Sequence, residues 1–209
     1  MFIHSRWGAE VMSLQHLFVY GSMAEGMVHF DKIRNFILTV QPAQTFGTAY
    51  RLKIGYPVIT LIGQDRIHGN LLELNSSELL WHILDEFYGC NPHDKSKSFY
   101  QREVVDVWVG SESQKASVYV TSENKIPASA QTICGGDWQA ALRSHPPMSD
   151  KLTDKQKNYV LKLGSSSSRE IVPIDMTLYR ELMSLELIVD KGRRLALSQL
   201  GQELYRHLK

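Results

Sequence analysis

The stretch Leu17-Phe18-Val19-Tyr20-Gly21-Ser22-Met23 decides how the rest of the sequence is interpreted. A short apolar run that is rich in β-branched and aromatic residues and stops at a glycine is typical of a buried strand. Gly21 and Ser22 then turn the chain, and their backbone amides, with no bulky side chains beside them, can hold a carboxylate or an oxyanion. Taken alone, the stretch is explained better as a buried strand that ends in an ordinary turn.

The composition describes an ordinary globular protein. The 209 residues suffice for one full domain and a small second one. Of these, 43% are hydrophobic and 22% are charged, and the net charge of +1 gives no overall attraction to nucleic acid or membrane. No apolar run approaches the roughly 18 residues that a membrane span needs.

Two cysteines, Cys90 and Cys134, are the only ones in the chain. So few cysteines argue against a disulfide scaffold and against a thiolate metal site, and they indicate a reducing, cytoplasmic location. His29, His68, His82 and His93 show no paired spacing with carboxylates that would suggest a metal site, so no metal is predicted.

The chain divides into four segments by composition. Residues 1–13 contain no signal-peptide core, and because Met12 is a second possible start we expect them to form an N-terminal extension. Residues 14–143 form the first predicted domain. Residues 144–150 are rich in Pro and Ser and predict a linker, and residues 151–209 form a second, smaller domain.

Several strands and one helix are predicted in the first domain. Ser76 or Ser77 caps a helix that runs to about Phe87 and ends at Gly89. Gly69, inside a strand, marks a bulge or a close backbone approach. The strands predicted after Tyr20 cover residues 36–40, 46–52, 56–61, 67–74, 103–109 and 115–120. Together they indicate an α+β domain with a closed or nearly closed antiparallel sheet.

An ordered set of short motifs resembles the γ-glutamylcyclotransferase-like, or AIG2-like, family over about residues 14–140. Each motif is weak alone, and their order and spacing make the resemblance fairly specific. The motifs are Tyr20-Gly21-Ser22, Tyr56-Pro57, Gly69–Leu74, Leu84–Gly89, Tyr100-Gln101-Arg102, Ala116–Val120 and Gly136-Asp137-Trp138.

The resemblance implies a small mixed β-barrel with flanking helices and a pocket at the end of the first strand. It also implies that Tyr20, Gly21, Ser22 and Met23 bind a γ-glutamyl group. In the family's usual reaction the substrate's α-amine attacks its own γ-carbonyl and releases 5-oxoproline, without a metal or another cofactor. Such a reaction needs a general base for the ammonium and preorganised donors for the oxyanion.

The chain departs from the family at the base. The family places a glutamate directly before the glycine that ends the helix, and here that residue is Tyr88. A neutral phenol with a pKa near 10 is a poor base at pH 7. Glu86 is the other catalytic candidate, but it lies about 200° away around the helix axis. Glu103 or Asp106 could also be recruited. The alternative is a non-catalytic pocket in which Tyr88 only hydrogen-bonds a ligand.

The second domain resembles a winged-helix module. The predicted elements are a helix from the capping box of Thr153 and Gln156 to Leu163, a short helix at residues 168–172, a helix at residues 174–185, a hairpin around Asp190-Lys191-Gly192 and a last helix capped by Ser198. Eleven Lys or Arg and seven Asp or Glu give residues 151–209 a net charge of +4.

Lys191, Arg193 and Arg194 lie on the predicted wing, where they could contact DNA phosphates. A docking module for a protein partner or for dimerisation, or a solvated basic hairpin, explains the same charges. The sequence therefore predicts a small-molecule ligand of the γ-glutamyl type for the first domain and leaves the partner of the second domain open.

Overall fold

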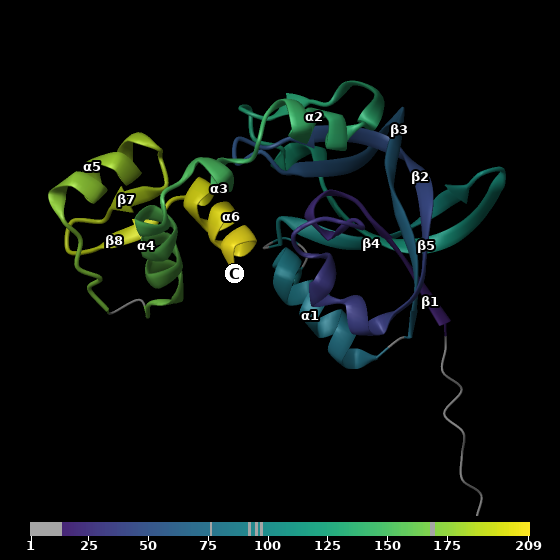
Figure 1. Ribbon diagram of the computed structural model, residues 1–209, viewed down its shortest axis with the longest axis horizontal. Coiled ribbons are helices and arrows are strands. Elements are labelled where there is room, and N and C mark those ends of the chain that lie inside the picture. The colour runs from purple at the N-terminus through teal and green to yellow at the C-terminus, as the bar shows by residue number, and fades with distance from the viewer. Residues whose placement is uncertain (1–13, 76, 92, 95, 97, 168–169) are drawn as a thin grey trace, which may run out of the picture.

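The computed structural model of the protein describes residues 14–75, 77–91, 93–94, 96, 98–167 and 170–209. The predicted N-terminal extension, residues 1–13, lies outside the described residues. Figure 1 shows a sheet-rich part and a helical C-terminal part side by side, with α6 (Gln199–Leu208) at the junction between them.

Five strands close into a small barrel. β1 (Leu14–Val19) pairs antiparallel with β3 and parallel with β5, and β2 closes the ring by pairing with both β3 and β4. A short sixth strand, β6 (Gln131–Thr132), extends the sheet beside β2. The other strands of the barrel are β2 (Ile37–Arg51), β3 (Pro57–Asn75), β4 (Tyr100–Val109) and β5 (Glu112–Thr121). The predicted α+β fold with a small mixed barrel is confirmed.

Four of the predicted strands merge in pairs into two long continuous strands, β2 and β3. Residues 36–40 and 46–52 are predicted as separate strands, as are 56–61 and 67–74, but β2 runs through Pro42 and β3 runs through residues 62–66. The two strands pair along almost their whole length, with a register shift at Gly47/Thr48. Pro42 of β2 pairs with Asn70, so strand pairing continues β2 across the proline. In β3 the exposed residues 61–64 have no partner at the register shift and form a bulge.

The predicted helix and the close approach at Gly69 are both present. Ser77 accepts a hydrogen bond from the Leu80 amide and so caps α1 (Glu78–Tyr88), whereas Ser76 lies outside the described residues. Gly89 ends the helix in the left-handed conformation with φ of 60°. A Cβ atom on Gly69 would stand 2.3 Å from the Val19 carbonyl oxygen, so β1 and β3 lie too close there for a side chain.

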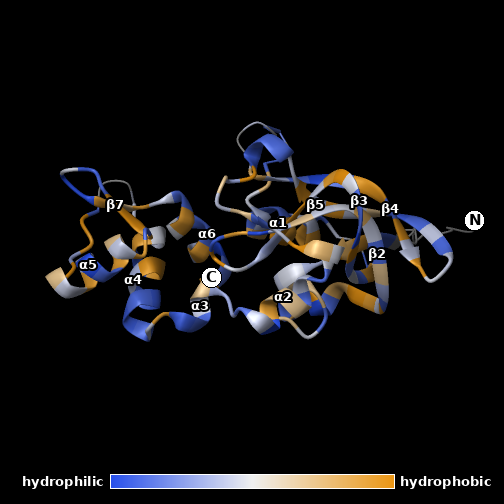
Figure 2. Ribbon diagram, turned by 90° about the horizontal axis from the view of Figure 1, so that it is seen from above, coloured by the Kyte–Doolittle hydropathy of each residue, from blue (hydrophilic) through white to orange (hydrophobic). Residues whose placement is uncertain are grey.

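Two apolar cores hold the molecule together. One fills the barrel interior and includes Phe18, Val118 and Trp138. The other lies outside the barrel, beneath α1, and continues into the C-terminal part as far as Leu204. Because this second core is continuous, burial of apolar surface joins the two parts. Figure 2 shows apolar residues along the barrel strands and a mixture of apolar and polar residues on α4 and α6.

From Thr153 onward the elements follow the predicted order except at residues 168–172, whereas residues 144–150, predicted as a linker, include most of a short helix, α3 (Met148–Lys151). After α2 (Trp138–Ser144) and α3 come α4 (Asp154–Ser165), α5 (Met176–Ser184), β7 (Ile188–Asp190), β8 (Leu195–Leu197) and α6. The capping box at Thr153 is formed with Gln156 as predicted. Residues 170–172 are not helical, so a helix over residues 168–172 is not formed there, and 168–169 lie outside the described residues. The winged-helix assignment stays a prediction.

No helix within the described residues is long and apolar enough to cross a membrane.

Candidate functional site

The turn after β1 is a single 3-10 turn, Gly21–Met23. Gly21 has φ of 71°, in the left-handed region that favours glycine. The carbonyl oxygens of Gly21 and Ser22 accept hydrogen bonds from the amides of Ala24 and His29, at 3.1 and 2.9 Å. The amides that open a helix have no acceptor inside it, so those of Gly21 and Ser22 need an acceptor outside the 3-10 turn.

Tyr20 anchors this turn to the barrel. Its hydroxyl donates to the Tyr119 carbonyl oxygen at 2.6 Å and accepts from the Ile59 amide at 3.3 Å. Burial raises the pKa of Tyr20 well above its usual value, with smaller contributions from Tyr100 and Tyr88. Tyr20 is therefore a neutral group that holds the turn, and Met23, which is fully buried, packs into the core outside the barrel.

A small cavity of about 20 Å³ lies at the turn. Its walls come from three regions: the turn residues 20–22, the aromatic rings of Tyr56, Tyr88 and Tyr100, and Glu203, Arg206 and His207 of α6. A space of this size holds about one water molecule. The C-terminal helix thus covers the place where the sequence predicts a ligand.

Tyr88 stands in the wall of the cavity. Its ring stacks on Tyr119, with centroids 4.1 Å apart and an interplanar angle of 11°, and meets Tyr100 edge-on at 5.1 Å. Burial raises the pKa of Tyr88 far above neutrality. The phenol is therefore neutral at physiological pH, and it can hydrogen-bond a ligand but cannot take up a proton as a phenolate.

The other carboxylates considered in the sequence lie away from the cavity. Glu86 is exposed and pairs with Lys209 at 2.7 Å, which lowers the pKa of its carboxyl. Its position agrees with the rotation around the helix expected from the sequence. Asp106 pairs with Lys115 at 2.8 Å on the outside of β4, and Glu103, also on β4, does not line the cavity.

Glu203 is the carboxylate that sequence reasoning missed. The residue is 7% exposed, one oxygen pairs with Arg206, and the other, Oε2, finds no hydrogen-bond partner among the described residues. Burial raises the pKa of Glu203, while Arg206 works in the opposite direction. No local motif marks this residue, because only the docking of α6 on the barrel brings it to the cavity.

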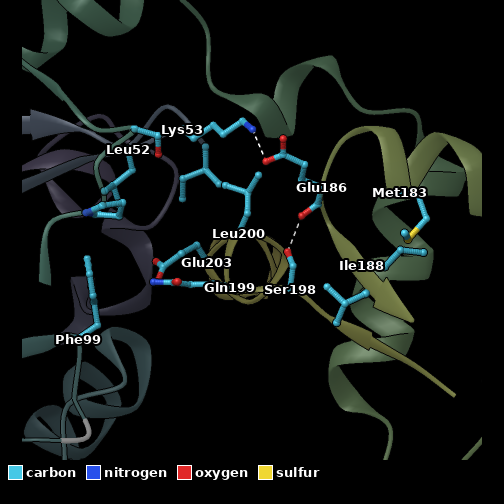
Figure 3. Close-up of a pocket in the computed structure, with 14 residues that line it drawn as sticks. Leu52, Lys53, Phe99, Met183, Glu186, Ile188, Ser198, Gln199, Leu200 and Glu203 are labelled. Carbon is cyan, nitrogen blue, oxygen red and sulfur yellow. Dashed lines mark hydrogen bonds and ion pairs between the residues drawn. The ribbon is translucent and has the colours of Figure 1, made fainter. Parts of the chain in front are cut away.

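A larger cavity of about 430 Å³ lies on the other side of Glu203, between the barrel and the C-terminal part. Apolar side chains such as Leu52, Phe99 and Leu200 form most of its wall. In Figure 3, Glu203 projects from α6 toward the side where Leu52 and Phe99 lie, and Lys53 pairs with Glu186 at the rim. Glu203 therefore lines both this junction cavity and the small cavity at the turn.

The predicted wing residues are on the surface. The hairpin turn is closed by the Lys191 amide, which donates to the Arg194 carbonyl oxygen at 2.9 Å, and by the Gly192 amide, which donates to the Asp190 carboxylate at 2.7 Å. Lys191, Arg193 and Arg194 are exposed. They lie on a different element from the residues around the cavity, so the structure presents two separate candidate sites. No group of three or more His, Cys, Asp or Glu suited to a metal ion occurs within the described residues.

Comparison with known proteins identifies the barrel. Residues 17–140 match the family model described as gamma-glutamyl cyclotransferase, AIG2-like. No curated protein matches the sequence.

Solved structures that match the chain share little sequence with it. YkqA from Bacillus subtilis is 20% identical with a TM-score of 0.48, covering 68% of this chain and 44% of its own, so this chain spans less than half of that protein. An AIG2-like protein from Mus musculus is 20% identical with a TM-score of 0.44, covering 55% of this chain and 80% of its own. A protein from Arabidopsis thaliana is 22% identical with a TM-score of 0.46, and the match covers 79% of this chain and 94% of that protein.

Proposed function

This chain belongs to the gamma-glutamyl cyclotransferase, AIG2-like family, and on that premise we propose that it binds a γ-glutamyl amine or peptide at the Gly21–Ser22 turn and releases 5-oxoproline from it. Among the described residues, Cys90 and Cys134 form no disulfide, which supports the cytoplasmic location included in the proposal.

One observation supports the proposal most strongly. The Gly21–Ser22 turn, whose amides open a 3-10 turn, forms one wall of the small cavity, and a buried carboxylate lines the same cavity. Cyclisation of a γ-glutamyl group needs donors for the oxyanion and an acceptor for the proton of the α-ammonium. Both kinds of group therefore border one space.

A second candidate function is ligand binding without turnover. One observation favours it: α6 leaves only about 20 Å³ at the turn. The family resemblance also implies that Tyr88 stands where the family has its base. In this version a γ-glutamyl-type ligand is sensed by the barrel, and the C-terminal part contacts DNA or a protein partner through Lys191, Arg193 and Arg194.

Incubation of the full chain with a panel of γ-glutamyl amines and peptides, with 5-oxoproline measured as the product, tests the proposal. Release from at least one compound is expected. Thermal melts with the same panel separate the two candidates, because a ligand that raises the melting temperature without being cleaved supports the binding protein. If no compound releases 5-oxoproline and none raises the melting temperature, both the enzymatic and the binding function are excluded.

A further inference from the structure

We propose that Glu203, on the C-terminal helix α6, is the proton acceptor of this pocket and takes the place of the family's glutamate at the position of Tyr88. The inference rests on the proposed function and adds the residue that the reaction otherwise lacks. In this arrangement the C-terminal part completes the active site of the barrel.

Glu203 is the one carboxylate among the described residues that line the small cavity. The nearest acids of α1 are engaged elsewhere. Asp85 accepts a hydrogen bond from the Tyr119 hydroxyl and pairs with Arg102 at 3.7 Å, and Glu86 pairs with Lys209. A base has to lie within hydrogen-bond reach of the proton that it removes, so residues turned away from the cavity do not meet the requirement.

The state of the Glu203 carboxyl suits a base. Arg206 binds one oxygen and favours the ionised form, while Oε2 is buried and has no hydrogen-bond partner among the described residues. An unpaired oxygen of a buried carboxylate is costly unless a donor reaches it, and a substrate ammonium is such a donor. Burial also raises the pKa of Glu203, which brings its basicity closer to that of a catalyst working near neutral pH.

The position of α6 is held by contacts at both ends. Near its start, a Cβ on Gly201 would stand 2.0 Å from the Leu187 carbonyl oxygen, so only glycine allows this approach to the hairpin. Leu204 is fully buried in the core that joins the two parts. Near its end, the His207 ring stacks on Tyr56, with centroids 3.8 Å apart. The carboxylate is therefore held in place by the packing of its helix.

The reaction balances with the groups present. Glu203 removes one proton from the substrate's α-ammonium, and the freed nitrogen attacks the γ-carbonyl carbon to form the lactam C–N bond. The oxyanion accepts hydrogen bonds from the turn amides. The second proton passes from the attacking nitrogen to the leaving nitrogen, the old C–N bond breaks, and the released amine takes the first proton back from Glu203. The products are 5-oxoproline and an ammonium, with no water or redox partner consumed.

The cavity has to widen for a substrate, because about 20 Å³ does not hold a γ-glutamyl group. Arg206 offers the simplest route. Its side chain is 25% exposed, so the guanidinium can swing toward solvent and uncover the carboxylate, leaving the backbone of α6 in place. The substrate's ammonium would then pair with Glu203, and its carboxylate would pair with Arg206. These two ion pairs would replace the one between Glu203 and Arg206.

The test compares E203Q with wild type in the 5-oxoproline assay, with E181Q as the matched control, because Glu181 is an exposed glutamate of α5. E203Q keeps the shape of the side chain and removes the base, so kcat is expected to fall by about 10²–10⁴-fold. The acidic limb of the pH–kcat/KM profile is expected to disappear with it. E181Q is expected to retain wild-type rates and the wild-type pH profile.

A second variant separates loss of the base from a change in the docking of α6. In Y88E/E203Q the carboxylate returns to the family's position, and recovery of at least 10-fold over E203Q is expected. Activity of E203Q equal to wild type would overturn the role of Glu203 and leave the proposed function intact. Absence of 5-oxoproline release by the wild-type chain from every compound would instead overturn the proposed reaction itself.

Discussion

His207 of α6 lies flat against Tyr56 of the barrel, with ring centroids 3.8 Å apart and an interplanar angle of 16°. The same imidazole stands 5.8 Å from the ring of His29, which follows the Gly21–Ser22 turn in the chain. Two histidines from opposite ends of the sequence therefore meet where the C-terminal helix covers the candidate site.

The first prediction concerns pH. Burial, followed by Lys32, lowers the pKa of His29 to about 4, and burial, followed by His29 and Arg206, lowers that of His207 well below its usual value. Unfolded histidine titrates near 6.5, so between about pH 6.5 and 4 the unfolded chain binds more protons than the folded one. The contribution of the two neutral histidines to the free energy of unfolding is therefore fully present above pH 6.5. It falls on acidification, by up to about 1.4 kcal/mol per pH unit for each histidine.

Thermal melts between pH 7.5 and 5 measure this dependence. H207F keeps a ring on Tyr56 and removes one titrating group, so a shallower decline is expected. H82F, at an exposed histidine of α1, is the control and should decline as wild type does. A decline in H207F as steep as in wild type would contradict the assignment to His207.

The second prediction concerns the turn. Gly21 and Gly110 both have left-handed backbones, with φ of 71° and 60°, but a Cβ on Gly21 would stand 3.0 Å from Pro57 Cγ while one on Gly110 meets nothing within 4 Å. G21A and G110A are each expected to lose about 1–2 kcal/mol from the backbone alone. G21A should lose more, and it alone should lose stabilisation by a γ-glutamyl compound. Equal ligand responses in the two variants would argue against the turn as the binding site.

The third prediction concerns the joining of the two parts. Leu204 is fully buried in the core that runs from the barrel into the C-terminal part, whereas Leu79 of α1 is 59% exposed. L204A is expected to cost about 2–5 kcal/mol, and the exposed L79A less than about 0.5 kcal/mol. Because the core is continuous, the L204A substitution should lower the melting temperature of the barrel as well as that of the C-terminal part. Barrel unfolding at the wild-type temperature in L204A would show that the parts unfold independently.

The fourth prediction concerns the hairpin. If Lys191 and Arg193 contact phosphates, K191Q/R193Q should weaken retention on duplex DNA and reduce the slope of log K against log salt by up to about two. K151Q/K162Q removes the same charge from exposed positions outside the hairpin and should behave as wild type. Equal retention of wild type and K191Q/R193Q at all salt concentrations would remove DNA from the candidate partners of this hairpin.

Much of the fold could be predicted from the sequence because its signals are local. The apolar run before Gly21, the cap at Ser77, the left-handed Gly89 and the capping box at Thr153 each depend on residues within about one helical turn of one another. The order of the motifs then indicated the barrel. The merging of four predicted strands into β2 and β3 was missed, because pairing with β3, and not local propensity, continues β2 through Pro42, and a bulge at residues 61–64 joins the two halves of β3.

The sequence by itself determined the strand, the turn and the absence of a glutamate at position 88, since each is a property of neighbouring residues. Only the tertiary structure decided what faces that turn. Glu203 and His207 reach it because Leu204 and Gly201 dock α6 against the barrel and the hairpin, and contacts between distant parts of a chain leave no local pattern. The packing of one C-terminal helix thus places a carboxylate beside the Gly21–Ser22 turn.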